Sequence, residues 1–223
     1  MKAPLALVVA KAPVPGQAKT RLGAVVGPER AAGLAAAALL DTLGACVAAF
    51  GVERCHLSLA GDLATASRGE ELVAATRGWT IHEQVGDGFA ERLRRAHEDA
   101  AGAGEVRTAT PVIQVGMDTP QLEARHLHDV AALLHGPDDA VLGPAEDGGW
   151  WLLGVGSPAL VEHLADVPMS TQETGHFTRI ALEKAGAAVQ ETVTLRDVDE
   201  VEDAEHVAAA APDTLFARSW SAR

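Results

Sequence analysis

The amino-acid sequence predicts a single α/β domain in which helices cover both faces of a mostly parallel β-sheet, a three-layer α/β/α sandwich. Short apolar runs alternate with longer Ala- and Leu-rich segments along the chain, and strands alternating with helices in this way form βαβ units. The 223 residues suffice for one well-buried core. Because no long linker, repeat or low-complexity run divides the chain, we expect one domain over 1–223, with a weakly patterned tail over 212–223.

The expected elements begin with a buried strand over 5–10 and a helix over 28–50, for which Pro28 suits the first turn. Further strands are expected over 56–60, 79–84, 111–115, 140–142, 150–155 and 188–194. Further helices are expected over 64–76, 89–101, 122–134, 158–164 and 174–185, with a last helix after Asp199. Sites in such sheets lie beyond the carboxyl ends of the strands, so we expect functional residues in the segments that follow the strands.

Composition excludes several classes of protein. With Lys+Arg 18 against Asp+Glu 31 the net charge is −13, which disfavours a general nucleic-acid binder, and a hydrophobic fraction of 48% excludes a disordered chain. The cysteines, Cys46 and Cys55, fall in predicted core elements, so we expect buried, reduced thiols. The apolar run over 5–10 is too short to span a membrane. We therefore expect a cytoplasmic protein without membrane contacts, and the Ala-rich helices leave a homodimer interface open.

The segment after the first strand concentrates positive charge. It contains Lys11, Gly16, Lys19, Thr20 and Arg21, and the first 28 residues hold four cations and no acid. Gly permits close backbone approach, Lys supplies a point charge, and Arg can form a fork to phosphate oxygens. We therefore expect a phosphate-binding loop. A solvated basic loop is the plainer alternative, but it does not explain the position after the first strand. The Gly-Lys-Ser/Thr order of a Walker loop is absent.

Acidic residues follow later strands. Asp118, in Gly-Met-Asp-Thr-Pro after the strand over 111–115, could ligate Mg²⁺ or Mn²⁺, which prefer oxygen ligands. Asp118 could instead cap a helix. Asp197 and Asp199 precede the last predicted helix and could either supply a second carboxylate to the same metal or, in the case of Asp199, cap that helix.

A turn rich in acids and glycines joins two predicted strands. It contains Glu146, Asp147, Gly148 and Gly149 and leads into Trp150-Trp151. An ordinary hairpin would explain Asp-Gly at this place. Because successive strand residues point to opposite faces, at most one of the two tryptophans is expected in a site and the other in the core.

Four motifs in this order resemble a known family. They are Lys-Ala-Pro-x-Pro-Gly-x-x-Lys-Thr-Arg-Leu (11–22), Gly-x-Asp-x-Pro (116–120), Gly-Pro-Ala-x-Asp-Gly-Gly-Trp-Trp-Leu-Leu-Gly (143–154) and Asp-Val-Asp (197–199). Together they resemble the bacterial radical-SAM/selenodomain-associated transferase 1 family, also described as a glycosyltransferase of arsenosugar biosynthesis, which belongs with the nucleotide-diphospho-sugar transferases of GT-A fold. The resemblance covers roughly 5–206. The Ala-Lys-Thr-Arg-Leu piece also resembles the phosphate loop of 2-phospholactate guanylyltransferases.

The resemblance implies a GT-A fold, a divalent metal (Mg²⁺ or Mn²⁺), and a nucleotide over the first half of the sheet. It implies nucleotide or phosphate contacts from Lys11, Gly16, Lys19, Thr20 and Arg21. It implies a metal held by Asp118, with Asp197 or Asp199 completing the site, and catalytic roles for Asp118 and Asp147. It implies that the transferred or accepted group faces Asp87, Glu146, Gly148, Gly149 and Trp150. The sequence departs from the family at the Trp-Trp pair, where pairs containing Tyr are common, and over 88–91, where Leu-Gly-Glu is expected.

Three functions follow from these residues. The leading one is glycosyl transfer from a nucleotide-diphospho-sugar to a small-molecule acceptor. The alternative is nucleotidyl transfer from a nucleoside triphosphate to a phosphorylated small molecule with release of pyrophosphate, which three loop cations would suit. A non-catalytic nucleotide-binding module is the remaining alternative, since a fold alone does not prove activity.

Overall fold

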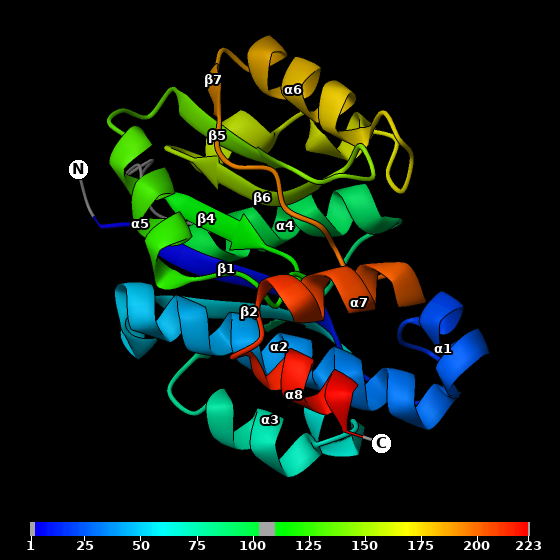
Figure 1. Ribbon diagram of the computed structural model, residues 1–223. Helices are drawn as coiled ribbons and strands as arrows, with labels where there is room; N and C mark the ends of the chain where they lie inside the picture. The colour runs from blue at the N-terminus through cyan, green and yellow to red at the C-terminus, as the bar shows by residue number, and fades with distance from the viewer. Residues whose placement is uncertain (1–2, 103–109, 223) are drawn as a thin grey trace.

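The computed structural model describes residues 3–102 and 110–222, which form a seven-stranded sheet with helices on both faces (Figure 1). The strand order is β3-β2-β1-β4-β6-β5-β7. The strands are β1 (Leu5–Lys11), β2 (Cys55–Ala60), β3 (Thr80–Glu83), β4 (Val112–Val115), β5 (Asp139–Pro144), β6 (Trp150–Val155) and β7 (Ala188–Glu191). Only β6 runs antiparallel to its neighbours, so the predicted three-layer, mostly parallel fold is confirmed.

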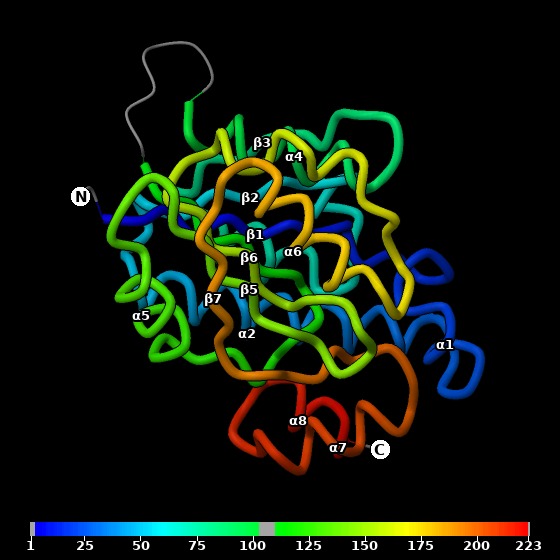
Figure 2. The backbone as a smooth tube through the Cα atoms, turned by 90° about the horizontal axis from the view of Figure 1, so that it is seen from above, coloured from blue at the N-terminus to red at the C-terminus, as the bar shows by residue number. Residues whose placement is uncertain are grey.

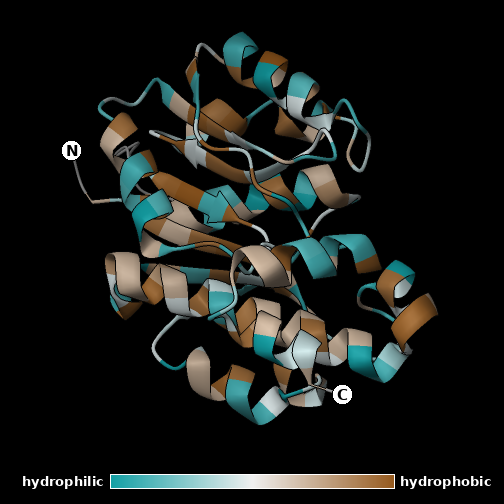
Figure 3. Ribbon diagram, in the orientation of Figure 1, coloured by the Kyte–Doolittle hydropathy of each residue, from teal (hydrophilic) through white to brown (hydrophobic). Residues whose placement is uncertain are grey.

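The helices divide between the two faces of the sheet. On one face lie α2 (Pro28–Phe50), α3 (Gly69–Ala75) and α5 (Ala124–Leu133), and on the other α4 (Phe89–Ala101) and α6 (Thr174–Lys184). The alternation of β1 explains this division, because Ala6 and Val8 pack in the first layer and Leu7 and Val9 in the second. Figure 3 shows the apolar residues gathered in the central strands.

The long helix α2 is the main helix of the core. By length and composition it could cross a membrane, with a mean hydropathy of 1.8 over its most apolar window, but 56% of that window is buried inside the protein. Leu39, Leu43 and Cys46 pack against the sheet, while Leu34 packs against the C-terminal helices. Cys46 is buried beside the sheet with Cys55, and both thiols are free. The prediction of buried, unpaired cysteines is confirmed.

Two helices were not anticipated. The short helix α1 (Thr20–Val26) follows the basic loop, and α8 (Leu215–Ser221) lies in the tail that the sequence left unpatterned. Asp41 on α2 explains where α8 begins. Its two carboxylate oxygens accept the backbone N–H groups of Leu215 and Phe216. Figure 2 shows α8 beside α7 (Val201–Ala210) at one side of the molecule.

Two predicted helices are shorter than expected. The segment over 64–76 splits into a 3-10 turn and α3, because Arg68 takes a left-handed conformation with φ 56° between them. The segment over 158–164 forms a 3-10 turn over Pro158–Val161, and another follows over Leu164–Asp166. The predicted strand over 188–194 ends at Glu191.

The sheet brings the predicted motifs to one edge. The carboxyl ends of β1, β4 and β5 and the start of β6 lie at this edge, because β6 is antiparallel to β4 and β5. The chain diverges on either side of β1, since β2 and β4 are both its parallel neighbours. Such a switch point is where open α/β sheets bind ligands.

Candidate functional site

The basic loop after β1 has a defined conformation that sets the positions of its charged residues. Lys11 is exposed at the end of β1, and its Nζ donates to the carbonyl of Gln17 at 3.3 Å. Gly16 turns the loop with φ 74°, a conformation that favours glycine. Lys19 precedes α1 in a left-handed conformation with φ 48°, and Thr20 is the exposed first residue of that helix.

Lys19 is at the centre of an ion-pair network. Its Nζ lies 2.6 Å from a carboxylate oxygen of Asp118 and 3.1 Å from one of Asp199, and its side chain is 11% exposed. A carboxylate oxygen of Asp199 also pairs with Arg21, whose Nη1 lies 2.9 Å away. Burial on its own would lower the pKa of Lys19, but the charges and hydrogen bonds of Asp118 and Asp199 raise it above its ordinary value. Two of the three predicted phosphate cations are therefore already paired with predicted metal carboxylates.

Asp197 lies next to this network without joining it. Thr119, just after Asp118, donates its hydroxyl to Asp197 at 2.8 Å, and the backbone N–H of Val198 donates to the carbonyl of Asp118 at 2.9 Å. These bonds tie the loop after β4 to the segment before α7. Burial, and then the negative charge of Asp118, raise the pKa of Asp197 well above the usual range. A carboxyl in this position favours a cation beside it.

Asp118 and Asp197 could supply two of the ligands of a divalent cation. Within residues 3–102 and 110–222 no group of three or more His, Cys, Asp or Glu side chains is arranged to hold a metal. Mg²⁺, however, commonly takes only one or two protein carboxylates, with phosphates and water as its other ligands. Burial and then the negative charge of Asp118 raise the pKa of Asp197, and a divalent charge would relieve the repulsion between the two carboxylates. The donor set therefore suits a metal that arrives with phosphates.

The turn between β5 and β6 is held by local bonds. Asp147 accepts the backbone N–H of Gly149 at 2.8 Å, as expected of an ordinary Asp-Gly turn, and its side chain borders the site. Gly148 has φ 88°, and a Cβ there would lie 2.1 Å from the carbonyl oxygen of Gln172. Glu146 pairs with Arg196, whose Nε lies 2.8 Å away. The glycine therefore permits the turn to dock against the segment before α6.

The two tryptophans face opposite sides, as the alternation predicts. Trp151 is 1% exposed, and its Nε1 donates to the carbonyl of Val193 at 2.9 Å. Trp150 is half-buried, with Nε1 donating to the hydroxyl of Thr178 at 3.0 Å, and it lines a cavity at the site edge. Trp150 is the site-facing member of the pair and Trp151 is the core member.

Three cavities meet at Asp118. The basic cavity, of about 350 Å³, is lined by the loop over 11–21 together with Asp118 and Asp199. The acidic cavity, of about 410 Å³, contains Asp118 and Asp147 with the acid-rich segment over 196–203. The aromatic cavity, of about 230 Å³, lies between the start of α4, the turn over 145–150 and the segment over 168–174. Asp118 borders all three cavities and is therefore the point at which they adjoin.

Sequence reasoning missed much of the aromatic cavity. Phe89, Gln114, Met169, Thr171 and Thr174 line it. Their patterns indicate only a helix start, a buried strand and a loop, and it is the docking of Gly148 against 172 that brings the last three residues to the site. The predicted acceptor residue Asp87 lies in the exposed turn before α4 and does not border these three cavities. Its role stays a prediction.

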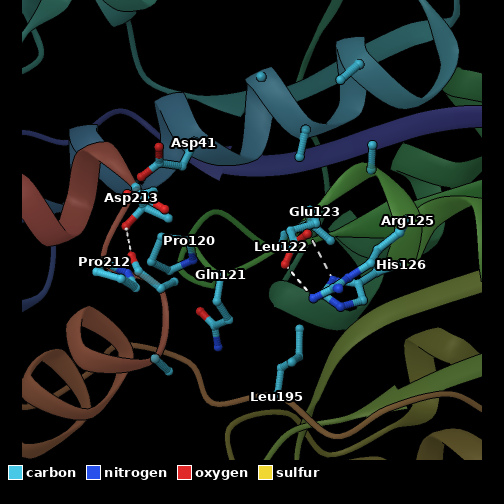
Figure 4. Close-up of a pocket in the computed structure, with 17 residues that line it drawn as sticks. Asp41, Pro120, Gln121, Leu122, Glu123, Arg125, His126, Leu195, Pro212 and Asp213 are labelled. Carbon is cyan, nitrogen blue, oxygen red and sulfur yellow. Dashed lines mark hydrogen bonds and ion pairs between the residues drawn. The ribbon is translucent and has the colours of Figure 1, made fainter.

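A further cavity of about 740 Å³ lies away from this edge, between α2, the start of α5 and the link from α7 to α8 (Figure 4). It contains none of the predicted site residues. Most of the polar groups named here are engaged: Asp41 accepts the start of α8, and Glu123 and His126 form the reciprocal cap of α5. Gln121 points toward the cavity and donates to the carbonyl of Arg196 at 2.6 Å, while its Oε1 has no partner among the described residues. This cavity is larger than those at the site edge, but it lacks their charge pattern.

Comparison with known proteins identifies the family. Residues 42–171 match the family described as "Uncharacterized protein conserved in bacteria (DUF2064)". The chain belongs to this family. The match covers the strands and turns that carry Asp118, Asp147 and Trp150, whereas the basic loop lies before it. No curated protein matches the chain in sequence.

Solved structures share the whole fold. A Desulfovibrio desulfuricans G20 protein, provisionally named a nucleotide-diphospho-sugar transferase, is 26% identical with a TM-score of 0.78, over 99% of this chain and 94% of its own. A cytidylyltransferase from Leptospira borgpetersenii is 14% identical, with a TM-score of 0.58 over 95% and 87%. A nucleotidyl transferase from Methanothermobacter is 16% identical, with a TM-score of 0.58 over 98% and 100%. The DUF2064 chain therefore has the fold of GT-A-type transferases, which confirms the predicted fold and enzyme class.

Proposed function

We propose that this DUF2064 protein is a metal-dependent transferase that takes the glycosyl group of a nucleotide-diphospho-sugar and passes it to a small molecule. The observation that carries this proposal is the meeting of a basic cavity and a carboxylate-lined cavity at Asp118. A diphosphate fits the first cavity and a transferred group the second. The similarity to the D. desulfuricans protein over nearly the full length of both chains supports the same class of substrate.

The charges of the basic loop favour a diphosphate over a triphosphate. Lys19 is held by Asp118 and Asp199, and Arg21 by Asp199, so the cavity combines three cations with two carboxylates. That is a smaller positive field than the loop sequence suggested. A divalent metal held by Asp118 and Asp197 would supply the remaining charge for a departing diphosphate. Lys11, exposed and without a carboxylate partner among the described residues, is then free to meet the phosphates.

Asp147 is placed to assist the acceptor. It borders both the acidic and the aromatic cavities, and the N–H of Gly149 fixes its carboxylate. In the proposed step the acceptor hydroxyl oxygen bonds to the anomeric carbon while the bond from that carbon to the diphosphate oxygen breaks. The electron pair leaves with the nucleoside diphosphate, and the hydroxyl proton passes to Asp147. Membership of the arsenosugar-type glycosyltransferase family is part of this proposal.

Nucleotidyl transfer is the second candidate. Lys11, Lys19 and Arg21 line one cavity, and three cations would suit a triphosphate once the ion pairs to Asp199 open. The reaction would release pyrophosphate rather than a nucleoside diphosphate, so the two candidates differ in a measurable product.

A thermal-shift panel tests both candidates. Nucleotide sugars and nucleoside triphosphates are compared, each with Mg²⁺ or Mn²⁺, for stabilisation of the protein. We expect nucleotide sugars to stabilise most, and Arg21→Ala and Asp118→Asn to reduce the shift. Lys184→Ala, an exposed cation at the end of α6, is the matched control that leaves the shift intact. Preference for triphosphates followed by pyrophosphate release would establish the second candidate, and no shift with any nucleotide would reject both.

A further inference from the structure

The aromatic cavity has a composition unlike that of the other two. Phe89, Trp150 and Met169 give it apolar walls. Phe89, at the first position of α4, is 49% exposed, so its ring is accessible to a ligand. Trp150 is held in place by its bond to Thr178. A fixed and an accessible aromatic side chain in one cavity suit a ligand with an apolar face.

The charged groups of the aromatic cavity all have one sign. Asp118, Asp147 and Asp197 border it, and among the described residues that line it there is no Lys, Arg or His. The cations that line the two neighbouring cavities are Lys11, Lys19, Arg21 and Arg196, and the last three are paired with carboxylates. A divalent metal on Asp118 and Asp197 would balance those two carboxylates and leave the Asp147 carboxylate facing the acceptor. An anionic group entering here would lose its water and meet a like charge.

The floor of the cavity supplies no positive charge. Gln114 on β4 borders it and is 2% exposed. The Oε1 of Gln114 is shielded from the cavity and interacts with the buried ring of His97. Burial lowers the pKa of His97 to about 4, so this ring carries no charge at neutral pH that could meet an anionic ligand.

We infer that the acceptor molecule is an uncharged, hydroxyl-bearing compound with an apolar face, and that phosphorylated and carboxylated molecules are excluded. Its apolar face packs between Phe89, Met169 and Trp150, and its hydroxyl meets Asp147. This inference rests on the proposed transferase function, and it runs against a phosphorylated acceptor of the kind that the nucleotidyl alternative requires.

Matched acceptors test the charge rule. Phenyl β-D-glucoside is compared with phenyl β-D-glucuronide, and glycerol with glycerol 3-phosphate, by release of nucleoside diphosphate from the nucleotide sugar that gives the largest thermal shift. We expect the neutral member of each responding pair to be used ~100-fold more efficiently, since like-charge juxtaposition is strongly unfavourable. Equal or better use of the anionic members, or no response to any neutral member, would overturn the inference.

Variants of the cavity walls test its location. Phe89→Ala should raise the KM for the phenyl acceptor ~10-fold, whereas Phe89→Leu should restore most of the affinity. Met169→Lys should increase use of the glucuronide relative to Met169→Leu, because it adds the missing cation. Unchanged selectivity in Met169→Lys would place the acceptor elsewhere. Nucleotide-induced stabilisation is measured in parallel: its absence in the wild type rejects the proposed function, and its presence with anionic selectivity rejects only the inference.

Discussion

The ion pairs of Lys19 predict that removing this cation destabilises the protein more than removing an unpaired cation of the same loop. In Lys19→Met the unbranched side chain keeps its length and apolar stem but loses the ammonium group. Two contacts disappear, one of 2.6 Å to Asp118 and one of 3.1 Å to Asp199. Asp118 then remains beside Asp197 without a cationic partner among the described residues.

The magnitude follows from the exposure of the partners. Removing one partner of a fully buried ion pair lowers the free energy of unfolding by about 3–5 kcal/mol, whereas an exposed ion pair contributes about 0–1 kcal/mol. The Lys19 side chain is 11% exposed, but that of Asp118 is 31% and that of Asp199 49% exposed. Solvent screening at the two carboxylates places the expected loss between these limits, at about 2 kcal/mol of unfolding free energy.

Urea unfolding at neutral pH measures this loss, with Lys11→Met as the matched control. Lys11 is an exposed cation of the same loop, and its Nζ donates, among the described residues, to the carbonyl of Gln17 alone, so its replacement should change stability by less than about 0.5 kcal/mol. A double-mutant cycle with Asp118→Asn should show a coupling of about 1 kcal/mol. Equal stabilities for the two methionine variants, or a coupling near zero, would refute the assignment.

Three further changes have defined outcomes. Burial lowers the pKa of His97 to about 4, so the unfolded chain binds more protons than the folded one between about pH 6.5 and 4. Urea unfolding should therefore show the free energy of unfolding falling by up to about 3 kcal/mol as the pH drops through this window. In His97→Leu this fall should be smaller. Gly148→Ala should lower stability by about 2 kcal/mol, because the new Cβ meets the carbonyl of Gln172 at a φ of 88°; an unchanged Tm would contradict this. Trp151→Ala should destabilise by about 3–5 kcal/mol, and Trp150→Ala by clearly less, since only Trp151 is fully buried; calorimetry showing the reverse order would contradict the facing of the pair.

The sequence was most informative where one physical rule acts alone. Apolar runs predicted the central strands, such as β1, β4 and β6, because burial on both faces of the sheet demands them. The edge strands β3 and β7 are largely exposed, and their position in the alternation of strands and helices predicted them. Alternation predicted that Trp150 and Trp151 diverge, and the structure agrees. The positions of Asp118 and of the basic loop after strands predicted that they would meet, because parallel strands end at one edge of a sheet.

What the sequence could not predict depends on contacts between distant segments. Helix α8 exists where Asp41, on a helix far away in the chain, accepts its first N–H groups, and no local signal of the tail reveals that partner. The pairing of Lys19 with Asp199 joins residues 180 positions apart. Met169 reaches the aromatic cavity because the segment after it docks on Gly148. Spacing along the chain carries little information about such meetings.

The same contacts that stabilise the site also oppose its use. Under the proposed function, a divalent cation on Asp118 would compete with Lys19 for that carboxylate, and phosphates on Arg21 would compete with Asp199. A metal alone or a phosphate alone would break these pairs and leave one charge unmatched. A metal together with a diphosphate would replace both partners at once, because Asp118 and Asp197 would hold the metal while Lys19 and Arg21 would turn to the phosphates. The ion pairs would therefore favour joint binding of the two, as the proposed glycosyl transfer requires.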